Sequence, residues 1–464
     1  MPDFVNVAKM LPPEFPGDLT KNNHLEFLNR NLSIIVLDDD PTGTQTISDV
    51  PVLTTWAQEE ILKELEESVP LFFILTNSRS LTPPKADALA FEIGKNIRSA
   101  SDKAGRNVMV ISRGDSTLRG HYPNEVVALG EGLGWTHAPH ILIPALFQGG
   151  RHTVGDIHYV REGNQLIPAG ETPFARDSVF GYRASNLKMY VEEKTGGKIN
   201  QKDVVSISLD LIRKGGPDAV AKCVSDLQAG QVCIVNAFCQ SDLDVFAAGY
   251  YKSGRVGYPM LFRTAASFIN SMSGLPPKDP LRHDDFTLDG AGGVVLVGSY
   301  VPKTTRQLEF MKDKLKAGYI EVNTSALLSS DGMEQEISRV SDFINNTLGN
   351  GQVSVVFTSR KLIEGKNSSE NMAIINRVSD GIVEIMSRIE IRPRFMVVKG
   401  GITSSDVLTR SLGVKRAGVL GQISSGVPVW RLDDCDPFPG LIFIPFPGNL
   451  GDDDTVYNVV IKLI

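Results

Sequence analysis

Three consecutive carboxylates follow an apolar run near the beginning of the chain. Residues 34–37 are all apolar, which is typical of a strand buried on both faces of a parallel sheet. Asp38, Asp39 and Asp40 come directly after this run, where the carboxyl ends of such strands carry ligand-contacting loops. Adjacent carboxylates repel one another, so the cluster predicts a cation, a metal ion or several hydroxyl donors close by. The alternative is a solvated acidic turn, which the proline and glycine that follow would favour.

Basic side chains follow several predicted strands in the same half of the chain. They are Arg79, Arg113, Arg119 and Arg151. A guanidinium group is the side chain best matched to a carboxylate or a phosphate, and polar groups at the carboxyl ends of parallel strands meet at one edge of the sheet. The sequence therefore predicts an anion-binding site. The alternative is structural pairing, either with the three aspartates or, for Arg119, with Asp115 four residues earlier.

Three glycine-containing loops lie in the second half of the chain, before predicted helices. They occupy residues 297–300, 399–404 and 446–451. Such loops can present free backbone N–H groups to a phosphate at a helix N-terminus. Three of them in one α/β domain favour a nucleotide site over simple turns. The Walker pattern and the strict Gly-x-Gly-x-x-Gly fingerprint are both absent from the sequence, so this is neither a standard NTPase loop nor an ordinary dinucleotide fold.

Short apolar runs alternate with segments of helical periodicity, which is typical of sheets flanked by helices. The predicted strands are residues 34–37, 71–75, 108–111, 141–143, 204–207, 233–235, 260–262, 294–297, 319–322, 353–357, 395–398, 427–432 and 441–446. The predicted helices are residues 57–67, 86–97, 303–316, 333–346, 370–389 and 404–411, with a short helix from residue 264. We predict an α/β fold of two domains, each a mostly parallel sheet flanked by helices, with the active site in the cleft between them.

Length and local composition predict where the domains divide. A chain of 464 residues exceeds what one hydrophobic core usually serves. Residues 273–292 combine proline, glycine and charge without periodicity, which is typical of a linker. We predict an extended N-terminal arm leading into a short helix at 1–30, a first domain at 31–272 and a second domain at 293–464. Residues 148–186 lose the strand and helix rhythm and predict a hairpin-like excursion from the first domain.

Composition argues against several classes of protein. The sequence has a hydrophobic fraction of 42% and a charged fraction of 22%, which are typical of a globular protein. Its net charge of -7 argues against a general nucleic-acid binder. The four cysteines show neither zinc spacing nor a disulfide framework. The N-terminus lacks the apolar core of a signal peptide, and no run approaches the ~18 apolar residues of a membrane helix. We therefore expect a cytoplasmic protein without nucleic-acid or membrane partners.

Several short motifs, taken in order, resemble those of the four-carbon acid sugar kinases, which join a sugar-acid-binding N-terminal domain to a nucleotide-binding C-terminal domain. The motifs are Asp-Asp-Pro-Thr-Gly at 39–43, Ser78-Arg79, Gly-Asp-Ser-Thr-Leu-Arg-Gly at 114–120 with Glu125, Gly150-Arg151, Gly298-Ser299 with Thr304 and Gln307, Gly-Gly-Ile-Thr at 400–403, Gly-Val-Pro-Val-Trp at 426–430 and Gly-Asn-Leu-Gly at 448–451. The resemblance covers the chain from about residue 33 to the C-terminus. It implies ATP-dependent phosphorylation of the terminal hydroxyl of a four-carbon acid such as a threonate, an erythronate or an oxo-tetronate.

The resemblance also implies roles for individual residues. The base that activates the hydroxyl is expected to be Asp39 or Asp115. The implied substrate-binding residues are Asp40, Thr42, Ser78, Arg79, Arg113, Arg119 and Arg151. The implied nucleotide-binding residues are Gly298, Ser299, Lys399, Gly400, Gly401, Thr403, Gly448 and Asn449. Mg²⁺ would bridge the phosphates of ATP, no protein ligand of the metal is assigned, and a homodimer is a possible assembly.

The chain departs from the family pattern at two places. Many members carry a lysine just before the last glycine motif, where this chain has Phe446, and only some carry the lysine found here as Lys399. We hypothesise that Lys399 supplies the missing charge near the nucleotide phosphates. The segment at 172–177 is longer than the family pattern, with more aromatic residues around Phe180 and Tyr182.

Two other functions compete with the kinase. The spacing of Asp38, Asp40 and Thr42 after an apolar run matches the nucleophile motif of haloacid-dehalogenase-type phosphatases, in which Asp38 would attack phosphorus. Against this interpretation, the later aspartate pair of that family would have to be Asp452 and Asp453, which lie across a domain boundary and not after an apolar strand. The other alternative is a non-catalytic sensor that binds sugar acids.

Overall fold

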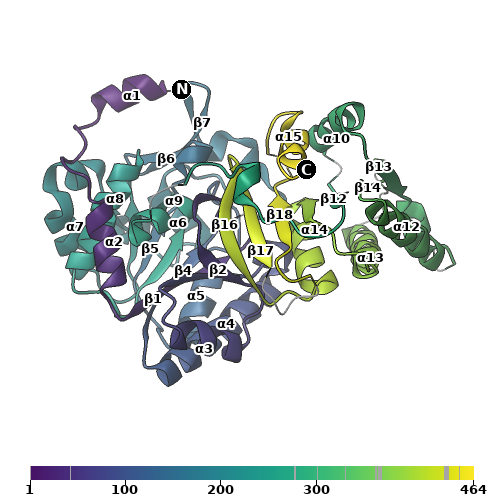
Figure 1. Cartoon of the computed structure of the whole chain (residues 1–464). Helices are drawn as coiled ribbons and strands as arrows, with labels where there is room; N and C mark the ends of the chain where they lie inside the picture. The colour runs from purple at the N-terminus through teal and green to yellow at the C-terminus, as the bar shows by residue number, and fades with distance from the viewer. Residues whose placement is uncertain are drawn as a thin grey trace. The chain divides into compact units, whose positions relative to one another are not determined.

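The chain forms two compact units (Figure 1). The computed structural model describes residues 2–41, 43–275, 278–299, 301–329, 331–360, 363, 368–432, 438–448 and 450–464. The first unit comprises Met1–Gly43 and Thr55–Pro277, and the second comprises Thr44–Thr54 and Lys278–Ile464. Within the described residues, no helix has both the length and the apolar character needed to cross a membrane.

The first unit is built on a parallel sheet flanked by helices. Its strand order is β3-β1-β4-β11-β5-β10-β9, and each neighbouring pair is parallel. The strands are β1 (Leu32–Asp38), β3 (Leu71–Leu75), β4 (Asn107–Arg113), β5 (His140–Ile143), β9 (Val205–Ile207), β10 (Val232–Val235) and β11 (Leu261–Thr264). The helices are α1 (Phe4–Met10), α2 (Thr20–Leu28), α3 (Gln58–Glu66), α4 (Pro83–Ala104), α5 (Asn124–Gly132), α6 (Leu187–Lys194), α7 (Gly216–Ser225), α8 (Gln240–Lys252) and α9 (Ala266–Ser273).

The excursion predicted at 148–186 contains a small antiparallel sheet. Its order is β6 (Arg151–Val154), β7 (Ile157–Glu162) and β8 (Gln165–Pro168). The N-terminal segment packs on this sheet, because the Phe4 N–H donates to the carbonyl oxygen of Asn164 at 2.8 Å. The expectation of an extended arm is wrong at α1, where the Asp3 carboxylate accepts a hydrogen bond from the Asn6 N–H and so begins the helix.

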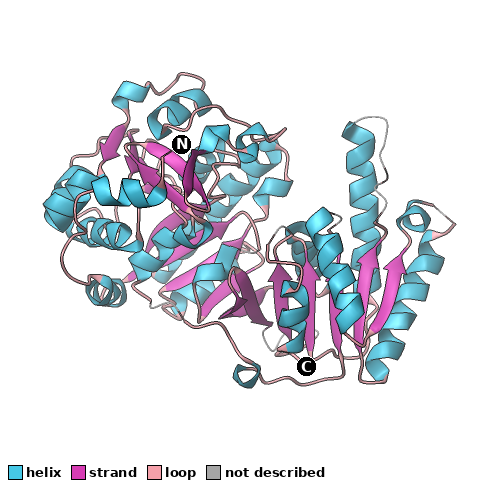
Figure 2. Cartoon of the chain, turned by 90° about the horizontal axis from the view of Figure 1, so that it is seen from above, coloured by secondary structure: helices cyan, strands magenta, loops and turns pink. Residues whose placement is uncertain are grey.

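The second unit combines a parallel and an antiparallel half in one sheet (Figure 2). The strands β13-β14-β12-β15-β18 pair in parallel, and the strands β18-β17-β16-β2 pair antiparallel. The strands are β2 (Val50–Leu53), β12 (Gly293–Val297), β13 (Gly318–Val322), β14 (Val353–Thr358), β15 (Phe395–Lys399), β16 (Arg416–Ser424), β17 (Val427–Leu432) and β18 (Ile442–Phe446). The helices are α10 (Pro302–Lys314), α11 (Thr324–Leu328), α12 (Met333–Gly349), α13 (Ser368–Ser387), α14 (Gly401–Asp406) and α15 (Thr455–Ile461). The predicted α/β class, with a large and mostly parallel sheet, is confirmed.

The strand β2 comes from the N-terminal half of the chain but belongs to the second unit. It pairs antiparallel with β16, and Val50 lies opposite Val419. The indole N–H of Trp430 donates to the hydroxyl of Thr44 at 2.9 Å, and both side chains are buried. The ranges predicted from the sequence placed residues 44–54 in the first domain. The strand β2 has only four residues and contains a proline, so its strand signal is too weak to assign it to a distant partner.

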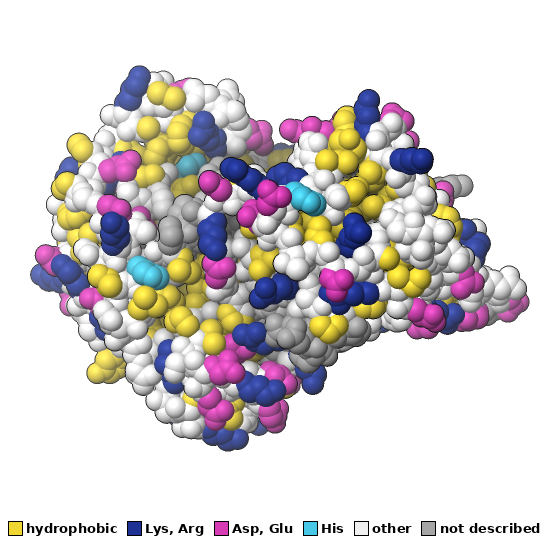
Figure 3. All heavy atoms as spheres, viewed as in Figure 1, with side chains coloured by type: hydrophobic (Ala, Val, Ile, Leu, Met, Phe, Trp, Pro, Cys, Tyr) yellow, Lys and Arg dark blue, Asp and Glu magenta, His cyan; other side chains and the backbone are white. Residues whose placement is uncertain are grey.

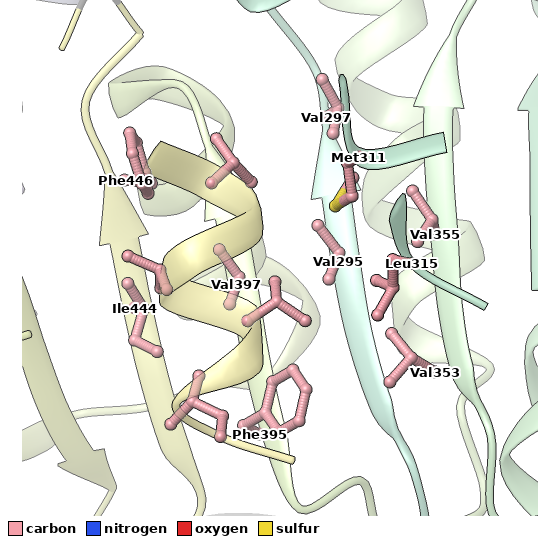
Figure 4. Close-up of a cluster of buried hydrophobic side chains, with 14 of the residues drawn as sticks. Val295, Val297, Met311, Leu315, Val353, Val355, Phe395, Val397, Ile444 and Phe446 are labelled. Carbon is pink, nitrogen blue, oxygen red and sulfur yellow. The ribbon is translucent and has the colours of Figure 1, made fainter. Parts of the chain in front are cut away.

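Apolar side chains from strands and helices form the core of the second unit (Figure 4). Val295, Val397 and Ile444 project from neighbouring strands, and Met311 of α10 packs in the same cluster. Each of these four side chains is fully buried, with 0% exposure, and burial of one such side chain stabilises a fold by roughly 1.5–3 kcal/mol. The strands β12, β15 and β18 are therefore rigidly placed, and so are the starting points of the glycine loops that follow them.

Charged side chains on the surface do not gather by sign on the face drawn in Figure 3. Lysine and arginine are interspersed there with aspartate and glutamate.

Candidate functional site

Neighbouring parallel strands of the first unit end at the same level. Asp38, the last residue of β1, lies opposite Leu75 of β3 and Arg113 of β4. Arg113 in turn lies opposite Thr264 of β11. The residues that follow these strands therefore meet at one edge of the sheet, as expected for an open α/β sheet.

Charged side chains at this edge form a connected set of ion pairs, called here the strand-end network. Its members are Asp38, Asp39, Asp40, Arg79, Arg113, Asp115, Arg119, Glu125 and Arg263. Arg79 lies at its centre, with Nη2 2.5 Å from Asp40 Oδ2 and Nε 3.3 Å from Asp39 Oδ2. Its Nη1 lies 3.7 Å from Asp115 Oδ1. Most of the charged residues proposed from the sequence for the acid site are thus brought together.

Asp39 is the network member whose carboxylate is least satisfied. The residue is 2% exposed, and neither carboxylate oxygen accepts a hydrogen bond from a described residue. Burial raises the pKa of Asp39, although the guanidinium groups of Arg79 and Arg263 lower it in part. A carboxylate with a raised pKa, and with two oxygens that accept no hydrogen bond from the described residues, is suited to accept a proton from a hydroxyl group.

Asp115 is held as a fixed anion. Its Oδ2 accepts a hydrogen bond from Arg119 Nε at 2.8 Å and another from the Thr117 hydroxyl. Burial alone would raise the pKa of Asp115, but Arg79 and Arg119 outweigh it and lower the pKa to about 2. Such a strongly stabilised carboxylate is a weak base, so its chemistry is that of a hydrogen-bond acceptor.

Asp38, the last residue of β1, is a buried member of the network that pairs with Arg113. Its Oδ1 is 2.8 Å from Arg113 Nη1, and the residue is 2% exposed. Burial raises the pKa of Asp38 to about 7 in spite of the nearby Arg113 charge. Asp38 is engaged by Arg113 through Oδ1, whereas neither oxygen of the equally buried Asp39 accepts a hydrogen bond from a described residue, and this difference disfavours the Asp38 nucleophile of the phosphatase alternative.

Arg263 is a member of the network that the sequence analysis missed. Its Nη1 donates to the Ser112 hydroxyl at 2.8 Å and to Glu125 Oε2 at 3.0 Å, and its Nη2 lies 4.0 Å from Asp39 Oδ2. Gly120 leaves the space that the guanidinium fills, because a Cβ atom there would lie 2.6 Å from Arg263 Nη2. Arg263 stands near the end of a strand like the other arginines, and that same signal could have identified it.

The other predicted substrate residues have different surroundings. The Ser78 hydroxyl donates to Glu125 Oε1 at 2.6 Å and is buried beneath the network. Arg151 begins β6, and it stands apart from the ion pairs of the network. Thr42 lies outside the described residues.

The excursion contributes side chains to the same region. The ring of Phe174 lies under the guanidinium groups of both Arg119 and Arg151, at 5.1 and 5.6 Å. The Tyr182 hydroxyl donates to the carbonyl oxygen of Thr117 at 2.7 Å, which fastens the excursion to the loop that follows β4. The sequence singled out this segment as unusual but gave no role to Phe174.

The glycine loops of the second unit surround a hollow of about 540 Å³. The predicted nucleotide residues that line it are Gly298, Ser299, Gly400, Gly401, Thr403 and Gly448. One side of the hollow is aliphatic, with Ile374, Ile375, Val378, Ile382 and Ile402. A polar, glycine-lined end next to an aliphatic wall suits a ligand with a phosphate chain and a flat apolar base.

Two of these glycines are required by the geometry of the hollow. A Cβ atom on Gly298 would lie 2.5 Å from the Thr403 hydroxyl oxygen, so only glycine lets these loops approach so closely. Gly400 has a φ of +122°, which a residue with a side chain rarely adopts. The residues present therefore fit a nucleotide.

Lys399 lies beside the hollow and does not line it. The side chain is buried, and its Nζ donates to the carbonyl oxygen of Pro447 at 2.9 Å. Burial lowers the pKa of Lys399 to about 7, with a smaller contribution from the charge of Lys303. The contact supports the loop that carries Gly448. Asn449 lies outside the described residues.

A protein-bound metal centre is not indicated by the described part of the chain. No group of three or more histidine, cysteine, aspartate or glutamate side chains is placed there to hold a metal ion.

Comparisons with known proteins agree with this division of roles. Residues 34–272 match the family described as a sugar-binding N-terminal domain, and residues 294–456 match a nucleotide-binding C-terminal domain. The D-erythronate kinase of Heliobacterium modesticaldum is 23% identical over 376 residues, which cover 77% of this chain and 80% of the relative. The combination defines a class of two-domain sugar-acid kinases.

Solved structures show the same fold. A Salmonella typhimurium LT2 protein, described as a candidate tRNA synthase, has a TM-score of 0.68 at 18% identity and covers 93% of this chain and 100% of its own. A Haemophilus influenzae protein has a TM-score of 0.63 at 18% identity with the same coverage. The chain belongs to the four-carbon acid sugar kinase family.

Proposed function

We propose that this protein is an ATP-dependent kinase that phosphorylates the terminal hydroxyl of a four-carbon sugar acid, such as a threonate, an erythronate or an oxo-tetronate. The observation that carries the proposal is the hollow of the second unit, where six residues proposed for the nucleotide line one cavity. The strand-end network of the first unit supports it with the charges that a small hydroxy acid requires. The D-erythronate kinase relative favours the same class of substrate.

In the first unit, arginine side chains bind the carboxylate of the acid, and aspartates bind its hydroxyl groups. Asp39 is the better candidate for the base, because its pKa is raised by burial while that of Asp115 is lowered to about 2. Asp39 accepts the proton of the attacking hydroxyl, and Asp40 and Asp115 orient the hydroxyl groups. Phosphoryl transfer depends mainly on positioning and on neutralising charge, and these roles supply positioning and a base on the side of the acid.

In the second unit, ATP places its phosphates against the glycine loops and its base against the aliphatic wall of α13 and Ile402. Gly298, Ser299 and Thr403 offer backbone and hydroxyl groups to the phosphate oxygens. Mg²⁺ would neutralise charge on the phosphates of ATP, and no protein ligand is assigned to it, since Mg²⁺ usually keeps several waters and takes few protein ligands in such sites. Lys399 acts by supporting the loop of Gly448.

An assay of ADP formation with a panel of tetronates tests the proposal. A kinase forms ADP only when its acid is present, a phosphatase releases phosphate from phosphoesters without ATP, and a sensor binds an acid without turnover. Asp39→Asn should lower kcat by roughly 10²- to 10⁴-fold, the usual contribution of general base catalysis. Asp102→Asn, which changes an exposed aspartate of the same unit, is the matched control. Absence of ADP with every tetronate would overturn the proposal.

A further inference from the structure

Arg151 differs from the other arginines around the strand-end network in having no carboxylate partner. Arg79, Arg113, Arg119 and Arg263 each lie between 2.5 and 3.0 Å from a carboxylate oxygen. Among the described residues, no aspartate or glutamate forms an ion pair with Arg151, and its buried Nε has no hydrogen-bond partner. Its Nη1 donates to the carbonyl oxygen of Gly149.

The position of Arg151 is nevertheless fixed. Its backbone N–H donates to the carbonyl oxygen of Leu146 at 2.9 Å, and it lies opposite Val160 in the β6–β7 ladder. The ring of Phe174 lies 5.6 Å from its guanidinium carbon and 5.1 Å from that of Arg119. A single aromatic ring thus places two guanidinium groups in one neighbourhood through cation–π contacts.

The charges around Arg151 show what this group lacks. Asp115 and Glu162 act on it only from beyond ion-pair distance, and the positive charge of Arg119 opposes its own. Burial lowers the pKa of Arg151, because the charged guanidinium has lost water without gaining a carboxylate. A half-buried guanidinium with a buried, unpaired Nε and no carboxylate partner among the described residues carries a desolvation cost, and a ligand carboxylate with two hydrogen bonds would offset that cost.

The paired arginines are poorer candidates for the same role. A substrate carboxylate at Arg79 or Arg113 would have to displace an aspartate that is itself buried. Displacement would leave an aspartate charge without its partner, which is strongly unfavourable in a buried position. Arg119 is less fully engaged than Arg79 and Arg113. Only its Nε donates to Asp115, and its Nη1 lies 3.8 Å from Asp177, so part of its guanidinium group stays available near Arg151.

We propose that Arg151, held in place by Phe174, binds the carboxylate of the substrate and selects an acid over the corresponding uncharged polyol. This inference rests on the sugar-acid kinase activity proposed above. The excursion from the first unit is then the element that sets specificity, and the strand-end network is the element that handles the hydroxyl groups. The chemical class selected is a small monocarboxylate bearing several hydroxyl groups.

The test compares D-erythronate with erythritol, which has the same carbon chain but a CH₂OH group in place of the carboxylate. The kcat/KM values for both compounds are measured for the full chain and for Arg151→Met. A bidentate arginine–carboxylate contact contributes two charge-assisted hydrogen bonds, so the acid-to-polyol ratio should fall on the order of 100-fold in this variant. Arg176→Met, which removes an exposed arginine of the same excursion, should keep the ratio of the parent protein.

Two further variants guard against a folding defect. Arg151→Lys keeps the positive charge but loses the planar fork, and we expect it to lose part of the ratio. Phe174→Leu should lower the ratio by roughly 3- to 10-fold, since it removes only the cation–π contacts that place Arg151. If Arg151→Met does not fold, these two variants decide the question.

The outcomes separate this inference from the proposed function. An acid-to-polyol ratio in the Arg151 and Phe174 variants equal to that of the parent protein would overturn the inference and leave the kinase activity intact. A parent protein that forms no ADP with any tetronate would overturn the proposed function. In that case, calorimetry still tests the carboxylate site, through the affinities of the parent and of the Arg151 variants for D-erythronate and erythritol. If the site exists, the parent binds the acid more tightly than the polyol, and the Arg151 variants lose this preference.

Discussion

Lys399 provides a sharp test of the electrostatics of the second unit. Its side chain has 0% exposure, its Nζ bonds Pro447, and the Nζ lies 4.2 Å from the centre of the Phe446 ring. Burial lowers the pKa of this amine from its ordinary value of 10.5 to about 7. We predict that Lys399→Met removes a pH-dependent cost of folding.

The sign follows from proton linkage. Between about pH 7 and pH 10 the unfolded chain holds a proton on Lys399 that the folded chain releases, so the free energy of unfolding rises with pH. The slope approaches about 1.4 kcal/mol per pH unit within this window. Between pH 7 and pH 9 the lysine should therefore add about 2 kcal/mol of stability that the methionine variant does not gain.

The assay needs a signal from the second unit alone. Trp430 lies in that unit, and Trp56→Phe together with Trp135→Phe removes the two tryptophans of the first unit. Urea unfolding is then followed by Trp430 fluorescence at pH 7, 8 and 9, with and without Lys399→Met. Lys316→Met, which changes an exposed lysine of the same unit, should follow the pH dependence of the parent.

Parallel pH profiles for the parent and Lys399→Met would refute the reasoning, because they would mean that the amine keeps its ordinary pKa in the folded protein. The affinity for ATP gives a separate readout. A loss of about tenfold or more that shrinks as the pH rises above 7, where Lys399 is neutral, would support the hypothesis that Lys399 supplies charge near the phosphates. A loss that does not change with pH would reflect only the support of the loop that carries Gly448. Unchanged affinity would contradict that hypothesis and leave Lys399 a purely structural role.

Three further predictions concern the strand-end network. Arg263→Met leaves Glu125 buried without its arginine partner. In urea unfolding, the variant should lower the free energy of unfolding of the first unit by about 3–5 kcal/mol. Adding Glu125→Leu should recover part of this loss. Gly43→Ala places a Cβ atom on the Asp38 carboxylate, so it should abolish sugar-acid turnover; an active variant with an intact thermal melt would contradict this. Because the pKa of Asp115 is lowered to about 2, its stabilising effect is present above about pH 4 and lost as the pH falls toward 2. Thermal melts between pH 2 and 5 should show a flatter decline for Asp115→Asn than for the parent.

The sequence was most informative where local chemistry and local structure agree. The apolar run at 34–37 followed by three acids predicted a buried strand that delivers carboxylates, and β1 ends at Asp38 with its neighbours in parallel register. The same rule predicted the positions of Arg79 and Arg113. It would also have found Arg263, but its strand was predicted to end at residue 262, two residues before its actual end at Thr264.

Features that depend on distant pairing could not be predicted in the same way. The strand β2 is recognisable only through β16, whose glycines at 418 and 421 weaken its own strand signal. Phe174 lies in a segment without periodicity, so nothing local distinguishes an aromatic ring under two arginines from an aromatic ring in a loop. In both cases the missing information is which residues meet in three dimensions.

The division of the chain between the units gives the acidic motif a physical meaning beyond its charge. The chain leaves the first unit after Gly43 and enters the second at Thr44, directly after the aspartates of the strand-end network. Thr44 is held by the buried indole of Trp430, at the end of the Gly-Val-Pro-Val-Trp motif. Asp38, Asp39 and Asp40 are therefore held by ion pairs of the strand-end network, and Thr44 is held within the second unit by Trp430. This gives a physical reason for two motifs almost 400 residues apart to occur together: the tryptophan fixes Thr44, only a few residues after Asp39, the base proposed above.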